Sequence, residues 1–93
     1  MILSFRCTAT ERIHRGEQTP DLPADIQKTA LRKLQQLDLA KSLDDLRVPP
    51  GNRLEPLKGN RKGQYSIRIN DKYRLCFVWT ESGPSEVVIV DNH

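Results

Sequence analysis

The chain has 93 residues, with 15 Lys and Arg, 12 Asp and Glu, a formal net charge of +3 and 37% hydrophobic residues. A chain of this length holds about one small domain, and we expect a single domain over residues 1–93. The composition is typical neither of a disordered chain nor of a membrane protein, because no apolar run approaches the ~18 residues that a membrane span needs. Residues 1–6 lack the charged and long apolar regions of a secretory signal, so we expect a cytoplasmic protein that does not contact a membrane.

The two cysteines, Cys7 and Cys76, allow at most one disulfide, which is too few for a disulfide-stabilised secreted fold. Both lie in apolar sequence that resembles a strand. We therefore predict two small buried thiols.

Positive charge is concentrated in one segment. Residues 53–74 contain seven Lys or Arg and two acidic residues, whereas the rest of the chain contains eight basic and ten acidic residues. A basic segment on a slightly acidic body is typical of proteins that bind phosphates or acidic surfaces. The alternative is that these are hairpin loops whose charges serve solubility.

The first half of the chain predicts helices after one short strand. Residues 2–7 alternate loosely and predict the strand, and residues 11–16 predict a polar helical segment that ends at Gly16. Residues 24–39 follow a helix entrance with an acid and a proline. Their apolar positions have the spacing of one face of an amphipathic helix: Ile26, Ala30, Leu34 and Leu37.

Two short segments connect this helix to the second half of the chain. Residues 42–45 have the spacing of a capping box, with Asp45 in place of Glu or Gln, and predict one further helical turn. Residues 49–52, with the sequence PPGN, predict a loop.

The second half predicts three antiparallel strands, because its periodicity changes to two. The strands are expected at residues 65–69, 73–79 and 87–90, with a turn at 80–85 before the last. A three-residue loop at 70–72 aligns the apolar positions on one face. In that register Ile69 faces Tyr73, Ile67 faces Leu75, and Tyr65 faces Phe77.

The predicted fold class is α+β, a small antiparallel sheet with two N-terminal helices packed on one face. The same register places Arg68 directly opposite Arg74 on the second face. Two like charges directly opposite each other are unfavourable unless an anion lies between them. The alternative is that one of the two arginines turns out to solvent.

Several kinds of site are excluded by spacing. The residues that might bind a metal, His14, His93 and the two cysteines, lack zinc-site spacing, and we expect neither a metal nor a cofactor. A phosphate-binding P-loop and a nucleophile elbow are also missing from the sequence.

The remaining polar groups fit metal-free RNA cleavage. We expect Lys58, Arg68 or Arg74, Asp91 and His93 to converge at one end of the second face. Cleavage of RNA without a metal needs a base for the 2′-hydroxyl, a cation beside the phosphorus and an acid for the 5′-oxygen. Histidine is the usual proton-transfer residue, although a terminal histidine is more often incidental.

Four segments resemble the HigB-type toxins of the RelE superfamily in order, spacing and chain length. They are residues 53–59 (RLEPLKG), 65–67 (YSI), 73–77 (YRLCF) and 91–93 (DNH). The resemblance implies a RelE-like fold and a small endoribonuclease that cleaves mRNA, usually in the 70S ribosomal A site. It also implies contacts with ribosomal RNA and neutralisation by a helix-turn-helix antitoxin of the HigA type.

The resemblance also implies roles for particular residues. Lys58 and Arg74 correspond to the residues that bind and stabilise the scissile phosphate. His93 corresponds to the general acid, and Asp91 to the acid that orients His93 or shares the role of base. The implied RNA contacts are Arg61, Lys62, Arg68 and Asn92.

Two positions depart from the family pattern. Members often have His at the position of Glu55 and Tyr at the position of Asn92. Glu55 either brings negative charge towards the phosphate site or serves as a general base. Two other functions therefore stay open: a ParE-like toxin that binds gyrase, although such chains generally lack the terminal histidine and the lysine, and a RelE-like scaffold with weak or no activity.

Overall fold

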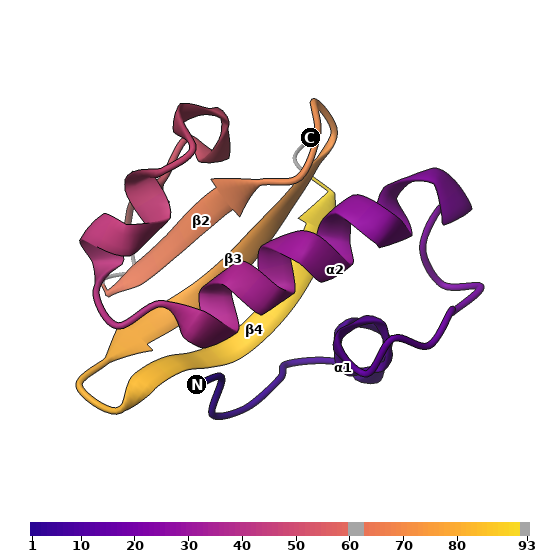
Figure 1. The fold of residues 1–93 in the computed structure, drawn as a ribbon, viewed down its shortest axis with the longest axis horizontal. Coiled ribbons are helices and arrows are strands. Elements are labelled where there is room, and N and C mark those ends of the chain that lie inside the picture. The colour runs from indigo at the N-terminus through magenta and orange to yellow at the C-terminus, as the bar shows by residue number, and fades with distance from the viewer. Residues whose placement is uncertain (60–62, 92–93) are drawn as a thin grey trace.

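The computed structural model describes residues 1–59 and 63–91 (Figure 1). Its helical elements are α1 (Thr8–His14), α2 (Ala24–Leu39) and two short 3₁₀ turns, η1 (Leu43–Arg47) and η2 (Pro50–Asn52). Its strands are β1 (Glu55–Pro56), β2 (Gln64–Arg68), β3 (Tyr73–Thr80) and β4 (Gly83–Asp91).

The strands form one antiparallel sheet in the order β1-β2-β3-β4. α2 crosses one face of this sheet, and α1 lies beside β4 (Figure 1). The predicted α+β fold is therefore confirmed. Within the described part of the chain, no helix is long and apolar enough to cross a membrane.

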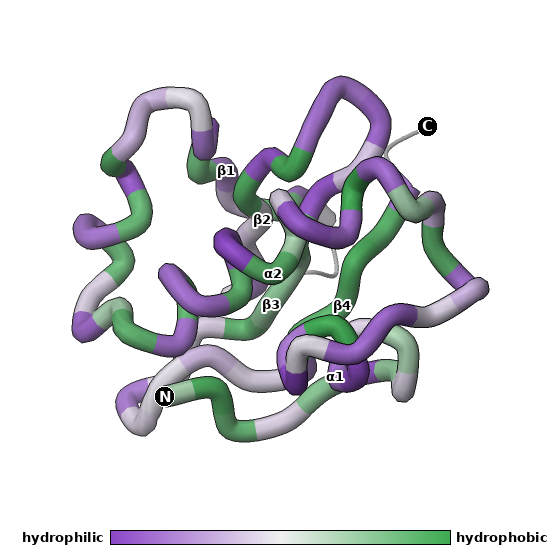
Figure 2. The backbone as a smooth tube through the Cα atoms, turned by 45° about the vertical axis from the view of Figure 1, so that its right-hand side comes forward, coloured by the Kyte–Doolittle hydropathy of each residue, from purple (hydrophilic) through white to green (hydrophobic). Residues whose placement is uncertain are grey.

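α2 begins and ends at the residues that the sequence predicts. The four apolar positions of its predicted face are all buried, with at most 3% of each side chain exposed. They pack with alternate residues of the strands in one core, to which Ile13 of α1 also belongs. The core residues from the strands and from the position after β2 are Ile67, Ile69, Leu75, Phe77, Val87 and Ile89. In Figure 2, β3 and β4 are largely hydrophobic, whereas the outer loops are largely hydrophilic.

The predicted register of the β2–β3 hairpin is confirmed. Tyr65 pairs with Phe77, and Ile67 pairs with Leu75. The backbone N–H of Ile69 donates to the Tyr73 carbonyl (3.0 Å) at the end of the hairpin. Because strand side chains alternate, the residues of β2, β3 and β4 that do not face the core form a second face of the sheet. This second face carries Ser66, Arg68, Arg74, Cys76, Val78, Val88 and Val90.

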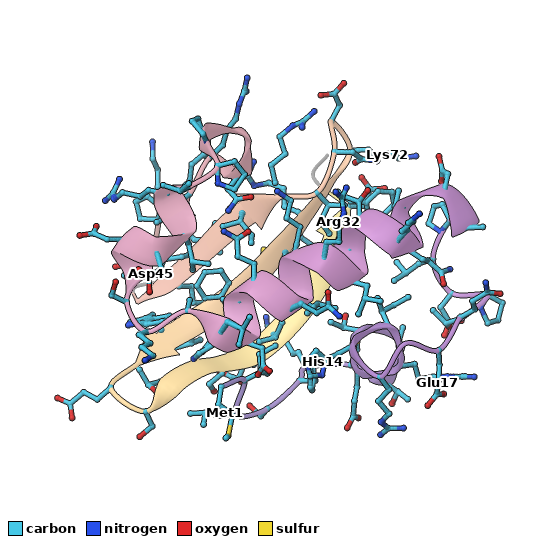
Figure 3. The ribbon with its side chains drawn as sticks, viewed as in Figure 1. Met1, His14, Glu17, Arg32, Asp45 and Lys72 are labelled. Atoms are coloured by element: carbon cyan, nitrogen blue, oxygen red, sulfur yellow. The ribbon has the colours of Figure 1, made fainter. Side chains whose placement is uncertain are left out.

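η1 forms where the capping-box spacing predicts a helical turn. The Asp45 carboxylate accepts hydrogen bonds from the backbone N–H groups of Lys41 (2.8 Å) and Ser42 (3.2 Å). Asp45 is labelled on this turn in Figure 3. The carboxylate satisfies backbone donors that have no partner within the turn itself.

Two predictions about strands were wrong, and one strand was missed. Residues 2–7 form no ladder, and their only bridge in the described structure is the parallel pair Phe5–Val87. β4 begins at Gly83 instead of residue 87. The turn between β3 and β4 occupies residues 81–82, whereas the sequence predicts a turn over residues 80–85. β1 was not expected, because two residues give no periodicity and one of them is proline.

The prediction of two buried thiols was half right. Cys76 is buried on the second face, but Cys7 is exposed. Cys7 precedes the first residue of α1, and its Sγ lies 3.2 Å from the Thr10 hydroxyl. A position just before a short surface helix leaves the side chain in solvent, which the alternation of residues 2–7 did not indicate.

Candidate functional site

Arg74 is the most tightly held charged side chain of the second face. It is the second residue of β3, and only 9% of it is exposed. Its Nε donates to the Ser66 hydroxyl at 2.8 Å, and its Nη2 donates to the Arg53 carbonyl at 2.7 Å. Ser66 lies diagonally across from Arg74 on β2, within reach of a long side chain. These two acceptors fix the orientation of the guanidinium.

The charge of Arg74 is partly offset by Glu55. Glu55 pairs with Ser66 across β1 and β2, and its carboxylate lies 4.0 Å from Nη2 of Arg74. The Glu55 side chain is 60% exposed, so water screens this ion pair. The Nη1 group of Arg74 has no hydrogen-bond partner among the described residues, and its two N–H groups are donors for an additional anion.

Backbone geometry brings the Arg53 carbonyl to Arg74. Arg53 follows η2 in the left-handed conformation, with φ 46° and ψ 58°. This conformation is uncommon for a residue with a side chain, and here it turns the chain from η2 into β1. The sequence gives no signal for a backbone acceptor of this kind. Ser66 was also not predicted as a partner of Arg74. The period-two pattern does place Ser66 on the same face as Arg74.

Arg68 lies opposite Arg74, as the sequence predicts, but the two guanidinium groups have separate partners. Arg68 forms a charged hydrogen bond with Asp71 in the β2–β3 loop, and 32% of its side chain is exposed. An anion between the two arginines is therefore not needed to explain the pair.

Arg68 also contributes to a cluster of positive charge with α2. The pKa of Lys33 is lowered by burial, and the charges of Arg32 and Arg68 lower it further. Positive charge therefore extends from Arg68 at the end of β2 to Arg32 and Lys33 on α2.

Lys58 is exposed in the connection between β1 and β2. The backbone N–H of Leu57 donates to the Gln64 carbonyl (2.8 Å), which holds this connection beside the start of β2. Lys58 itself has no hydrogen bond or ion pair with another described residue. Since Arg68 ends β2, Lys58 and Arg68 lie at opposite ends of that strand.

Asp91 is the last residue of β4 and is exposed. It pairs with Tyr73, whereas Arg74 pairs with Val90. By strand alternation, Asp91 belongs to the face of Tyr73 and not to the second face. Strand alternation therefore does not place Asp91 on the face of Arg74, where the sequence predicts it. The other expected site residues lie outside the described part of the chain: Arg61, Lys62, Asn92 and His93.

Within residues 1–59 and 63–91, no three His, Cys, Asp or Glu side chains gather in a way that would hold a metal ion. The groups that the structure does bring together are the Arg74 guanidinium, whose Nη1 has no hydrogen-bond partner among the described residues, and the Glu55 carboxylate. A fixed guanidinium with unused donors has the chemistry needed to bind a phosphodiester.

Comparison with known proteins identifies the family of this chain. Residues 3–93 match the family of RelE-like toxins of the type II toxin-antitoxin system HigB. The chain is 44% identical over 82 residues to Toxin HigB-1 of Vibrio cholerae serotype O1, covering 87% of this chain and 86% of that protein. It is 33% identical over 78 residues to an uncharacterized protein of Haemophilus influenzae, covering 84% and 76%.

A solved structure shows the same fold. The crystal structure of YafQ from E. coli strain BL21(DE3) superposes with a TM-score of 0.63 over 99% of this chain and 92% of that chain, at 13% identity. The family expected from the sequence motifs is confirmed, and this protein belongs to the HigB-like, RelE-like toxins of type II toxin-antitoxin systems.

Proposed function

We propose that this toxin is an endoribonuclease that cleaves mRNA without a metal ion, on the translating ribosome. The observation that carries the proposal is the fixed Arg74 guanidinium, whose Nη1 donors have no partner among the described residues. A preoriented cation of this kind stabilises the additional charge on the phosphorus at little reorganisation cost. Membership of the HigB-like family supports the same reaction class.

The roles proposed for the other residues follow the chemistry of the reaction. Lys58, an exposed cation beside the start of β2, binds the scissile phosphate together with Arg74. His93 donates a proton to the leaving 5′-oxygen. Asp91 precedes His93 by two residues and orients it or shares the role of base.

The proposed partners are mRNA, ribosomal RNA and a helix-turn-helix antitoxin of the HigA type. A type II toxin has a cognate antitoxin, and the helix-turn-helix class is part of the proposal. Arg68, at the end of β2, contacts the RNA backbone. The remaining proposed RNA contacts are Arg61, Lys62 and Asn92. These partners place the toxin in the cytoplasm.

The proposal is tested by cleavage of mRNA on purified ribosomes with two lysine variants. Lys58→Ala should lower the cleavage rate by roughly 10²- to 10⁴-fold, the typical contribution of a charge that stabilises the transition state. Lys41→Ala is the matched control, because Lys41 is also exposed but lies between α2 and η1. It should cleave at the rate of the unmodified toxin.

Equal cleavage by both variants would remove Lys58 from the site. If the unmodified toxin leaves mRNA intact but still stops growth, the nuclease assignment fails and a toxin that binds gyrase becomes the better account.

A further inference from the structure

Asn52 is a fully buried polar residue at the end of η2, with no exposed surface. Its side-chain oxygen accepts a hydrogen bond from Nζ of Lys33. Its amide nitrogen donates to Oε1 of Gln36 (3.0 Å) and to the Leu46 carbonyl (3.1 Å). A buried amide with both ends bonded has a closely defined position, because losing any partner leaves an unsatisfied polar group.

These contacts attach the connection between α2 and β1 to the helix. Lys33 and Gln36 lie one turn apart on α2, and both reach the same amide. Gln36 also donates to the Val48 carbonyl, which strengthens the attachment. The position of η2 is therefore set by α2, on the helical side of the sheet.

The same turn sets the position of one of the two acceptors that orient Arg74. Asn52 is followed directly by Arg53, whose carbonyl accepts from Nη2 of Arg74 at 2.7 Å. The backbone N–H groups of Asn52 and Arg53 donate to the Pro49 and Pro50 carbonyls, so the turn moves as one unit. A displacement of Asn52 would move the Arg53 carbonyl with it.

We infer that Asn52, held by Lys33, is a positioning residue for Arg74. It links the helical face of the sheet to the guanidinium on the second face through the Arg53 carbonyl. The inference rests on the proposed function only for its consequence in cleavage, since the link itself is a structural relationship. Without the link, Nη2 of Arg74 would lose its shortest hydrogen bond, and the guanidinium would sample orientations that do not face a phosphate.

The alternative is that Asn52 only stabilises the fold, so the test needs a control residue with a similar set of hydrogen bonds to a different loop. Gln27, on the same helix, provides one. Gln27 holds the loop at residues 19–22 through its side-chain amide. Its Nε2 donates to the Thr19 (2.7 Å) and Leu22 (2.9 Å) carbonyls, and its Oε1 accepts from the Thr19 N–H. None of these contacts involves η2 or Arg74.

The measurement is the rate of rotation of the Arg74 guanidinium about its Cζ–Nε bond, followed by NMR on the full chain with labelled arginine. The Arg74 signals are assigned by their loss in Arg74→Lys. In Asn52→Ala the rotation should be roughly fivefold faster, the factor that corresponds to one hydrogen bond of typical net strength. In Gln27→Ala it should be unchanged.

Lys33→Met keeps the aliphatic stem of Lys33 and removes its charge together with its contact with Asn52, so it decides the question if Asn52→Ala does not fold. It should also accelerate the rotation. Unchanged rotation in the folded variants, or equal acceleration in Gln27→Ala, would overturn the inference.

Cleavage kinetics give the second readout. Asn52→Ala should lower the maximal rate on ribosomes more than it raises the ribosome concentration for half-maximal rate. If the rotation responds as expected while the unmodified toxin cleaves no RNA, the link stands and the proposed function fails. If the unmodified toxin cleaves RNA but the rotation does not respond, the function stands and the link fails.

Discussion

Arg68 and Arg74 lie directly opposite each other on β2 and β3, and each guanidinium has its own partners. Arg74 donates to the Ser66 hydroxyl and the Arg53 carbonyl, whereas Arg68 binds the Asp71 carboxylate. The like-charge pair is tolerated because both charges have acceptors within the protein. The two arginines therefore differ in environment: Arg74 is buried and held by two acceptors, whereas Arg68 is half-buried at the end of β2.

Replacing Arg68 with Ala should weaken RNA binding without unfolding the protein. An exposed ion pair is worth only about 0–1 kcal/mol, so the free energy of unfolding should hardly change. Loss of one phosphate contact with single-stranded RNA should reduce the slope of log affinity against log salt by about 0.7. Arg47→Ala is the control, since Arg47 forms a similar exposed i,i+3 pair with Asp44. An unchanged salt slope in Arg68→Ala would mean that Arg68 does not touch RNA.

Replacing Arg74 with Met should destabilise the fold as well as abolish cleavage. The change leaves the Ser66 hydroxyl and the Arg53 carbonyl without their donor, which costs about 1–3 kcal/mol in urea unfolding. Ser66→Ala combined with Arg74→Met should cost less than the sum of the two single changes, because both remove the same hydrogen bond. Strict additivity would show that this bond contributes nothing to stability.

Much of the fold could be predicted because the residues repeat with a clear period. The four buried residues of α2 and the apolar pairs of β2 and β3 have strict spacing, so both elements and their register follow from the sequence. β1 has only two residues, and the extended segment around Phe5 forms a single bridge, so neither has a period to detect. A bulge in β4, with Glu86 at φ 51° opposite the 76–78 stretch of β3, likewise has no sequence signal.

The site could be predicted only in part. Sequence motifs identify Lys58 and Arg74, but they do not show that Arg74 is buried or that backbone at Arg53 holds it. That contact depends on a left-handed residue and on a turn fixed by Asn52, features that arise from tertiary structure. Whether Asp91 lies on the same face of the sheet as Arg74 depends on the register between β3 and β4, and the sequence does not determine that register.

Replacing Glu55 with Gln should strengthen RNA binding and leave cleavage intact. The Glu55 carboxylate lies 4.0 Å from the Arg74 guanidinium and offsets its charge. Because Glu55 is exposed, its charge is worth about 1 kcal/mol at most, so removing its repulsion of a phosphate should raise affinity at low salt by about fivefold at most. Filter binding and cleavage on ribosomes measure the two effects. A cleavage loss of about 10²-fold or more would instead assign Glu55 as the general base.

The stability contribution of Lys33 should depend on pH in the alkaline range. Burial, with Arg32 and Arg68, lowers the pKa of Lys33 below its ordinary value of 10.5. The unfolded chain therefore binds this proton more tightly, and the cost to the folded state is full at pH values below the lowered pKa. That cost is relieved as pH rises through the lowered pKa towards 10.5.

Urea unfolding of the unmodified toxin and of Lys33→Met from pH 7 to 10.5 measures this effect. The unmodified toxin should gain free energy of unfolding relative to the variant as pH rises. Lys28→Met, which removes an exposed lysine from the same helix, controls for the loss of one charge. Parallel curves for the unmodified toxin and Lys33→Met would contradict the lowered pKa.

The most direct test of the nuclease assignment is inducible expression of the toxin without its antitoxin, with mapping of 5′ ends in cellular mRNA before and after induction. We expect new ends inside translated codons within the period of growth arrest, and we expect them to disappear in His93→Ala. Growth arrest without new ends, or the same ends in His93→Ala, would contradict the nuclease assignment.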